Sequence, residues 1–574
     1  MTYEEAAEFA DSTKKYGSIL GLESIRNLMQ ELGNIQEQLH IIHVAGTNGK
    51  GSVCAFLSAA LTEAGYRVGR YNSPAVFERR EVFRIGETMI SKEEYAAVFE
   101  RVQTACEVLT KRGCPHPTVF EVETAAAFLW FYEKKCDLVL LETGMGGETD
   151  ATNLITHPVC SVLTSIGMDH MQYLGNTIEE IAKVKAGIIK KGCPVVALKQ
   201  GDSVCEVIKN KAEECGSRCV LVEVPASVEE NVMTEQGQRQ GRCIQDRPIQ
   251  KQCIQYPVQG TTLQDVHYGS VHTALGGIWQ RENLSLALAV LKLLEESDYS
   301  ITKEAVQSGI AKTIWHGRYE VLQTEPLFII DGAHNPIAAK RLKQTIEKDF
   351  TNREIIYIIG VLADKEHEKM LRLLLPGAKA VFTVTPDSPR ALDGESLAKE
   401  AQKYADNIWY VPDIGKAVKM AKETAKESDV ILAVGSLSYL KEVLPEELDV
   451  KETTRWMRGH TEEIRQVAEQ KMADLQMQQT VSVAVTTCYF PDRTYGDVTF
   501  PAGNYKTLRI ELGDAAGHNW WCVLYPNLCF LDTTNAVLPE KGKQQLKKVL
   551  TEDEYSEVTA GSKFQIRWFF WKEK

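Results

Sequence analysis

The sequence contains no apolar run near the ~20 residues that a membrane-spanning helix needs. Its first 17 residues include Glu4, Glu5 and Glu8, so they do not have the basic and then apolar pattern of a secretion signal. The 14 cysteines include no Cys-x-x-Cys pair and no Cys/His spacing typical of a metal site, which predicts reduced, mostly buried thiols. These absences exclude a membrane-embedded protein and a small disulfide scaffold, and they favour the cytoplasm.

The chain also has no excess of basic residues. Its 65 Lys and Arg residues face 78 Asp and Glu residues, for a net charge of −13. This balance argues against a general nucleic-acid surface, although a nucleotide site can be locally positive within an acidic protein. The contents of 44% apolar and 25% charged residues are ordinary for a globular protein. The 574 residues are too many for one core and predict about three or four domains.

A glycine-rich loop follows a short apolar run near the N-terminus. Residues 41–45 predict a strand and residues 53–63 predict a helix. Between them lie Gly46, Thr47, Asn48, Gly49, Lys50, Gly51 and Ser52. Such loops bind phosphates, because glycines allow close approach and a helix N-terminus presents free N–H groups. We expect Lys50 to reach the outer phosphates and Ser52 to lie near the metal and phosphate oxygens. Since the spacing differs from the standard one, a simple tight turn is the alternative.

Polar side chains follow three further predicted strands. Ser73 comes after the strand at 67–71, Glu142 closes the strand at 136–143, and Asp169-His170 follows the strand at 159–165. Ligands bind at the carboxyl ends of strands in parallel α/β sheets, so we expect these groups to share one rim with Lys50. A hydroxyl, a carboxylate and an imidazole there predict a hard-cation site beside bound phosphates. Taken singly, each has a structural alternative: a Ser-Pro turn, a carboxylate cap or a surface histidine.

A second α/β domain is predicted after residue 322. A strand at 327–330 ends in Asp331-Gly332-Ala333-His334-Asn335-Pro336, and a helix follows. Strands at 355–360, 380–385 and 429–435 continue the alternation, and the domain closes near residue 447. Asp331 again places a carboxylate at a sheet edge, with a helix-capping Asx turn as the alternative. The polar segment 224–276 is expected to be irregular or an edge strand.

Seven motifs resemble the folylpolyglutamate synthase and dihydrofolate synthase family of the Mur-ligase superfamily. They occur in family order: residues 43–52, Ser73-Pro74, 141–147 with 150–153, 165–170, 185–188, Trp315-His316-Gly317-Arg318 and 331–336. The resemblance implies an α/β fold with a P-loop ATPase domain and a smaller α/β ligase domain that closes around ATP. It covers the first 447 residues.

The resemblance also implies roles for single residues. The loop 46–52 would cradle the phosphates, with Asn283, Arg318 and Asp331 also contacting ATP. Ser73, Glu142 and His170 would hold Mg²⁺, and Lys185 would be carbamylated and support a second metal. His334 lies in the motif that lines the glutamate side of the cleft. Lys50, His170, Lys185 and His334 are therefore the expected catalytic residues.

The chemistry implied by the resemblance is amide ligation. ATP would phosphorylate the terminal carboxylate of a folate or dihydropteroate, and the amino group of L-glutamate would displace phosphate from the acyl phosphate. Cations must neutralise the approach of a carboxylate to a triphosphate. The expected partners are these small molecules, with no nucleic acid, and the expected state is a monomer. Ligation of a different amino acid or acceptor, as in cell-wall relatives, is a further option.

Three positions depart from the family pattern. Ala75 stands where many members have histidine, Glu148 replaces a usual arginine, and Trp279 replaces a usual histidine. The change at Glu148 reverses a charge near the expected pterin or glutamate site, so pterin preference is the property it affects.

The last quarter of the chain does not match the ligase. Residues 504–530 resemble the distal part of the stage II sporulation protein R family, an exported signal in endospore formers. We therefore expect an ATP-binding domain at 1–322, a ligase domain at 323–450, a helical linker at 451–480 and a β-rich α+β domain at 481–574. Trp520 and Trp521 would be core or interface residues, and Cys522 and Cys529 free thiols or a disulfide. The alternative function is sporulation signalling through this domain and a partner, with the ligase part as a scaffold.

Overall fold

The computed structural model describes residues 1–17, 21–224, 260–444, 457–474, 480–490, 493–495, 498–500 and 503–513. The chain divides into two compact units, Met1–Leu444 and Pro445–Lys574. Within the described residues, no helix is long and apolar enough to cross a membrane.

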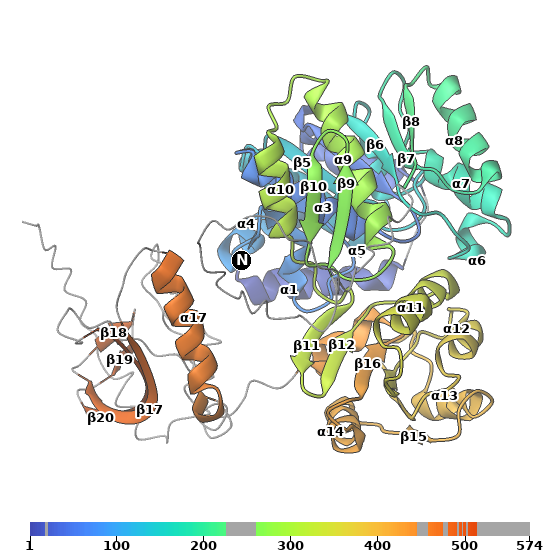
Figure 1. The fold of residues 1–574 in the computed structure, drawn as a ribbon. Coiled ribbons are helices and arrows are strands. Elements are labelled where there is room, and N and C mark those ends of the chain that lie inside the picture. The colour runs from blue at the N-terminus through green and yellow to red at the C-terminus, as the bar shows by residue number, and fades with distance from the viewer. Residues whose placement is uncertain are drawn as a thin grey trace, which may run out of the picture. The chain divides into compact units, whose positions relative to one another are not determined.

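The first unit begins with an eight-stranded sheet in the order β4-β3-β2-β5-β1-β6-β7-β8. Figure 1 labels four of these strands, β5, β6, β7 and β8. Strands β2, β5, β1, β6, β7 and β8 run parallel, and β3 and β4 extend the sheet antiparallel at one edge. The strands are β1 (Ile41–Ala45), β2 (Val68–Tyr71), β3 (Phe83–Ile85), β4 (Thr88–Met89), β5 (Leu138–Glu142), β6 (Cys160–Leu163), β7 (Val195–Leu198) and β8 (Cys219–Val222).

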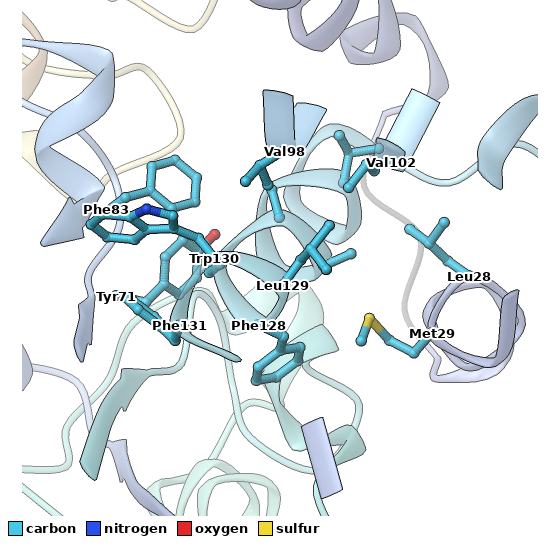
Figure 2. Close-up of a cluster of buried hydrophobic side chains, with 14 of the residues drawn as sticks. Leu28, Met29, Tyr71, Phe83, Val98, Val102, Phe128, Leu129, Trp130 and Phe131 are labelled. Carbon is cyan, nitrogen blue, oxygen red and sulfur yellow. The ribbon is translucent and has the colours of Figure 1, made fainter. Parts of the chain in front are cut away.

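Helices cover both faces of this sheet, because successive side chains of a strand point to opposite faces. Ile41 belongs to a buried cluster that includes residues of α1, α2, α4 and α5, whereas Ile42 belongs to one that includes residues of α3, α9 and α10. Figure 2 shows the first cluster, in which Tyr71 and Phe83 lie near Trp130 and Phe131. The helices are α1 (Tyr3–Ser12), α2 (Glu23–Glu31), α3 (Lys50–Glu63), α4 (Lys92–Lys111), α5 (Val119–Glu133), α6 (Met171–Leu174), α7 (Ile178–Ala186), α8 (Asp202–Glu214), α9 (Gln280–Glu295) and α10 (Lys303–Ala311), with 3₁₀ turns η1 (Thr13–Tyr16), η2 (Ile35–Gln38), η3 (Arg79–Val82) and η4 (Ala151–Leu154).

The first unit also contains a six-stranded sheet, in the order β11-β12-β16-β13-β14-β15. All neighbours are parallel except β11 and β12, which form a hairpin. Alternate strand residues again face two helical layers, α11 to α13 on one side and α14 and α15 on the other (Figure 1). The elements are β11 (Glu320–Thr324), β12 (Leu327–Ile330), α11 (Pro336–Asp349), β13 (Ile355–Ile359), α12 (His367–Leu374), β14 (Ala380–Thr383), α13 (Gly394–Ala401), β15 (Ile408–Tyr410), α14 (Ile414–Thr424), β16 (Val430–Val434), η5 (Leu437–Tyr439) and α15 (Leu440–Val443).

The predicted α/β fold and the strand alternation are confirmed, with differences at some element ends. Helix α3 begins at Lys50 rather than residue 53, since the Val53 amide already bonds to the Gly49 carbonyl at 3.0 Å. Helix α7 ends at Ala186, where Gly187 follows. The described part of the segment 224–276 forms a hairpin of β9 (Thr261–Asp265) and β10 (Gly269–Thr273), while residues 225–259 lie outside the described residues.

The second unit contains a helix and paired strands in its described part. Helix α17 (Thr461–Asp474) lies within the helical linker predicted at 451–480. Strands β17 (Val481–Phe490) and β20 (Gly503–Leu512) pair antiparallel, as do β18 (Arg493–Tyr495) and β19 (Val498–Phe500). Residues 514–574 of the predicted β-rich domain, with Trp520, Trp521, Cys522 and Cys529, lie outside the described residues.

Candidate active site

The carboxyl ends of four parallel strands form one side of a cleft in the first unit. Val44 of β1 pairs with Glu142 of β5 and with Val162 of β6, and Tyr71 of β2 pairs with Leu141, so the four ends are level. The loops after β1, β2 and β6 and the last residue of β5 carry Lys50, Ser73, His170 and Glu142. All four line the same cleft, so the structure brings them together. We call this half of the cleft the loop side.

Every residue predicted for the site lines this cleft, including those from the second sheet. They are Gly46, Thr47, Asn48, Gly49, Lys50, Gly51, Ser52, Ser73, Glu142, His170, Lys185, Asn283, Arg318, Asp331 and His334. Residues separated by nearly three hundred positions in the chain are thus brought together by two sheets whose strand ends face one another.

The glycine loop is shaped by packing as well as by backbone conformation. Gly46 (φ 153°) and Gly49 (φ 92°) adopt left-handed backbone angles. A Cβ at Gly46 would overlap the Thr164 hydroxyl, and a Cβ at Gly49 would overlap the Asn283 side chain. The Thr47 amide donates to the Ser165 carbonyl at 2.7 Å, which ties the loop to β6. The loop therefore needs glycine at both positions, and the tight-turn alternative describes only part of its geometry.

Lys50 and Glu142 face each other at the floor of the cleft. The Lys50 ammonium donates to the Gly46 carbonyl at 3.2 Å and lies 3.8 Å from the Glu142 carboxylate. Glu142 also accepts a hydrogen bond of 2.6 Å from the Asn72 side chain. Burial raises the pKa of Glu142, and Lys50 opposes that shift. A buried carboxylate with one cation beside it can bind a second cation. Its position is therefore explained without the alternative in which Glu142 caps a turn.

Lys185 and His170 both have a pKa below the usual value for their side chain. Burial, and then the nearby Lys50, lower the pKa of Lys185 to about 7. Its amine donates to the Gly46 carbonyl at 2.9 Å. Burial lowers the pKa of His170 to about 4, against the opposing effect of Asp169. A neutral lysine amine is the form that reacts with carbon dioxide to give a carbamate, and a neutral imidazole is the form that ligates metals.

The second sheet supplies the other half of the cleft, which we call the second-sheet side. Asp331 follows β12 and accepts hydrogen bonds from the amides of Ala333 at 2.8 Å and Tyr319 at 2.9 Å. Burial raises its pKa to about 6, although Arg318 opposes the shift. The Asx turn is therefore present, but Asn335 caps helix α11. His334 donates from Nδ1 to the Gly332 carbonyl at 2.8 Å, which leaves Nε2 as an acceptor.

One residue of the second-sheet side was missed in the sequence. Lys365 follows β13 and is almost fully buried; its ammonium lies 2.7 Å from Asp169 Oδ1 and 3.3 Å from His170 Nε2. Lys365, then His170 and His334, outweigh the effect of burial and hold the pKa of Asp169 well below its usual range. Asn335 donates to Asp169 at 3.2 Å as well. These contacts join the two halves of the cleft across the end where His334 lies.

The three departures from the family pattern are not equivalent in the structure. Trp279 lines the cleft beside Asn283 and packs edge-on against Tyr319, with ring centroids 5.9 Å apart. Ala75 and Glu148 are exposed and do not line it. The exchange at Trp279 is therefore the one that directly changes the cleft wall.

The donor set of the loop side fits the predicted Mg²⁺. Glu142 offers a buried carboxylate and Ser73 a hydroxyl at the same cleft wall, and oxygen ligands suit this hard cation. Within the described residues, no three His, Cys, Asp or Glu side chains are grouped as a metal site. The predicted set is consistent with that finding, because it draws on a serine and on a lysine whose carbamate would act as a carboxylate.

Comparison with known proteins supports each half of the cleft. Residues 44–291 match the Mur ligase middle domain, and residues 317–437 match the Mur ligase glutamate ligase domain. Residues 424–535 match stage II sporulation protein R.

The similar proteins are consistent with both domain matches. The dihydrofolate synthase/folylpolyglutamate synthase of Bacillus subtilis is 34% identical over 456 residues, which is 77% of this chain and 98% of that protein. The folylpolyglutamate synthase of Lacticaseibacillus casei is 32% identical and covers 68% of this chain and 87% of its own length. A structure of Mycobacterium tuberculosis folylpolyglutamate synthase complexed with ADP superposes with a TM-score of 0.67 at 27% identity, over 78% of this chain and 99% of that one. The protein is thus an ATP-dependent carboxylate–amine ligase, and its chain belongs to the folylpolyglutamate synthase/dihydrofolate synthase family of Mur ligases.

Proposed function

We propose that this protein adds L-glutamate to a folate, and that it also accepts dihydropteroate. The observation that carries this proposal is the joining of a phosphate loop, a buried carboxylate and a low-pKa lysine with Asp331 and His334 in one cleft. The Bacillus subtilis relative has both activities in its name, and the chain spans nearly all of that relative.

Each side of the cleft has a separate task in this proposal. Ser73, Glu142 and His170 would hold Mg²⁺, which would neutralise the phosphates of ATP while its outer phosphoryl group passes to the acceptor carboxylate to give an acyl phosphate and ADP. Lys50 neutralises the outer phosphates and so lets the acceptor carboxylate approach. His334, whose Nε2 lies 4.0 Å from Asp169, would orient the amino group of glutamate for its attack. The contacts of Lys365 and Asn335 with Asp169 keep this half closed, which excludes water from the acyl phosphate.

Lys185 is proposed to be carbamylated. Its low pKa and its burial give the neutral amine that the modification needs, and the carbamate would support a second metal. A Lys185→Ala variant should lose activity, and short carboxylates such as acetate should restore part of it. The control is Lys183→Ala, which changes an exposed lysine of the same helix and should behave like the parent protein.

The reaction is tested with purified full-length protein. Phosphate release should require an acceptor, glutamate and magnesium together, and mass spectrometry should show glutamate added to tetrahydrofolate, to dihydropteroate or to both. Offering the two acceptors in competition gives the preference. Phosphate release that is independent of both acceptors, or transfer of another amino acid, would reject the proposal.

We further infer the division into residues 1–322, 323–450, 451–480 and 481–574, a monomeric state, and a cytoplasmic location suited to an ATP-using enzyme. The domain matches and the unit boundary at Leu444 support the division. The sporulation-signalling alternative with a scaffold ligase has less support, because a scaffold does not need the buried charged groups of the cleft. Deletion of residues 451–574 tests it: ligation should persist, whereas a sporulation defect with no ligation by residues 1–447 would favour signalling.

A further inference from the structure

A second cavity adjoins the cleft. The only residues in its wall for which the sequence predicted a role are residues that also line the cleft. It shares Gly51, Ser73, Glu142 and Arg318 with the cleft, and it reaches β2, β3 and the segment at Trp315 and His316. The cavity is notable for arginines: Arg70, Arg84 and Arg318 all line it. We call it the arginine cavity.

Strand register places two of these arginines side by side. Arg70 of β2 pairs with Arg84 of β3, so their side chains leave the sheet on the same face. The next pair in the register is Tyr71 with Phe83, and both rings lie in the hydrophobic cluster on the opposite face (Figure 2). Like charges directly opposite one another destabilise a sheet unless something between them compensates.

Buried hydrogen-bond donors without acceptors line the same cavity. Arg70 is only 2% exposed, and neither its Nε nor its Nη1 has a hydrogen-bond partner. The indole Nε1 of Trp315 is buried and also has no partner. The Cζ atom of Arg70 lies 5.1 Å from the centroid of the Trp315 ring, so the guanidinium and the ring form a cation–π contact. This contact stabilises the positive charge of Arg70, but it gives the N–H groups of the guanidinium no hydrogen-bond acceptor. A buried donor without an acceptor is costly, and more so when it is charged.

The carboxylates around the cavity are already engaged. Glu142 is bound by Asn72 at 2.6 Å and faces Lys50. Glu81 accepts from the amides of Phe77 at 3.2 Å and Glu78 at 3.3 Å. Glu87 approaches Arg84 only to 4.0 Å and its side chain is 62% exposed. In the described part of the chain, no carboxylate forms an ion pair with Arg70 within 4.0 Å.

We propose that the arginine cavity binds a small oxyanion between Arg70 and Arg84, with the Trp315 N–H as a further donor. Three orphaned donors and two arginines on one face of the sheet favour a ligand that only accepts hydrogen bonds and carries negative charge, which describes a phosphate or a carboxylate. The shared wall at Ser73 and Arg318 connects this site to the place where phosphate is transferred. The bound oxyanion can therefore come from two sources: the phosphate that the reaction releases, or a carboxylate of the acceptor. Only this choice of source rests on the proposed function.

Binding is measured by calorimetry with inorganic phosphate and with glutarate, in full-length protein whose cleft is saturated with ADP and magnesium. One anion should bind per chain, and Arg84→Gln should weaken it about tenfold or more, because a charge-assisted partner is lost. The control is Arg112→Gln, an exposed arginine paired with Glu31, which should leave the affinity unchanged. Absence of binding in the ADP-saturated protein, or equal affinity in Arg84→Gln and the parent, would overturn the proposal.

A stability measurement separates a binding role from a packing role for Arg70. In anion-free buffer, Arg70→Met should raise the midpoint of thermal unfolding, because it removes an uncompensated buried charge while keeping the volume. Phosphate should stabilise the parent protein and not this variant. If Arg70 serves only to pack on Trp315, the variant melts lower and phosphate stabilises both proteins equally, which rejects the site.

The source of the anion is read from kinetics. If it is the released phosphate, Arg84→Gln weakens product inhibition by phosphate. If it is an acceptor carboxylate, the variant raises KM for acceptors with several glutamates more than for those with one. Either result supports the site, whereas a variant unchanged in both contradicts any link between the cavity and the reaction. Failure of the proposed function would appear differently, as absence of glutamate transfer by a protein that still binds the anion.

Discussion

The two halves of the cleft differ in how far they rely on backbone groups and on side chains. The glycine loop of the loop side is made largely from backbone: Gly46 and Gly49 hold left-handed angles against Thr164 and Asn283, and one lysine projects from the helix that follows. The second-sheet side is made from side chains on the loops after β12 and β13, with Lys365 as the cation that joins it to Asp169. Backbone suits a phosphate, which every nucleotide shares, and side chains suit the substrate that distinguishes one ligase from another.

The largest expected effect lies on the loop side. Replacing Lys50 with alanine should reduce kcat about 1,000-fold, because a preorganised positive group is lost where charge develops. The measurement is acceptor-dependent phosphate release at saturating substrates. Lys111→Ala, at an exposed position on α4, is the control and should be unaffected. Retained turnover in Lys50→Ala would remove the loop from the reaction and with it the contrast between the two halves.

The next effect concerns the contact that joins the halves. Lys365→Met leaves the buried Asp169 without its nearest cation, and losing one partner of a buried pair costs about 3 kcal/mol. We expect the free energy of unfolding in urea to fall by this order and KM for glutamate to rise. Lys369→Met, which removes an exposed lysine paired with Glu366, provides the baseline. If both variants unfold alike, Lys365 does not join the halves.

A smaller effect tests the support beneath the loop side. His43 of β1 is fully buried with Nε2 2.8 Å from the Thr152 hydroxyl, and burial lowers its pKa to about 3. The unfolded chain binds a proton at this histidine below about pH 6.5, whereas the folded chain does not until about pH 3. Stability is therefore lost as pH falls through this window, by about 2 kcal/mol at pH 5 from His43 alone.

The test of this pH effect compares unfolding free energies at pH 7 and pH 5. His43→Gln should lose less stability on acidification than the parent protein, while His157→Gln, at an exposed position, should follow the parent. Identical pH dependence in all three proteins would show that His43 is protonated in the fold.

The same contrast explains how much the sequence could predict. The rim of Lys50, Ser73, Glu142 and His170 was predictable, because each follows a short apolar run and parallel strands bring their ends to one edge. Lys365 was not predicted, although the strand at 355–360 was: Ala363-Asp364-Lys365-Glu366 looks like an ordinary charged turn. Only the rule that strand ends face the cleft, applied to β13 as it was to β6, would have singled it out. The arginine cavity depends on the register of β2 with β3, which periodicity does not determine.

The smallest expected effect comes from adding a methyl group on the second-sheet side, where flexible side chains can make room for it. A Cβ at Gly332 would overlap the Arg318 guanidinium and the Leu437 side chain, both of which can move aside. Gly332→Ala should therefore raise KM for ATP only about fivefold, with kcat nearly unchanged. Gly201→Ala, at an exposed glycine with nothing within 4 Å, is the control. Gly46→Ala should be far more damaging, because its φ of 153° and the packed Thr164 leave no room to adjust. A Gly332→Ala variant as impaired as Gly46→Ala would mean that both halves are equally rigid, and the division into a backbone half and a side-chain half would have to be abandoned.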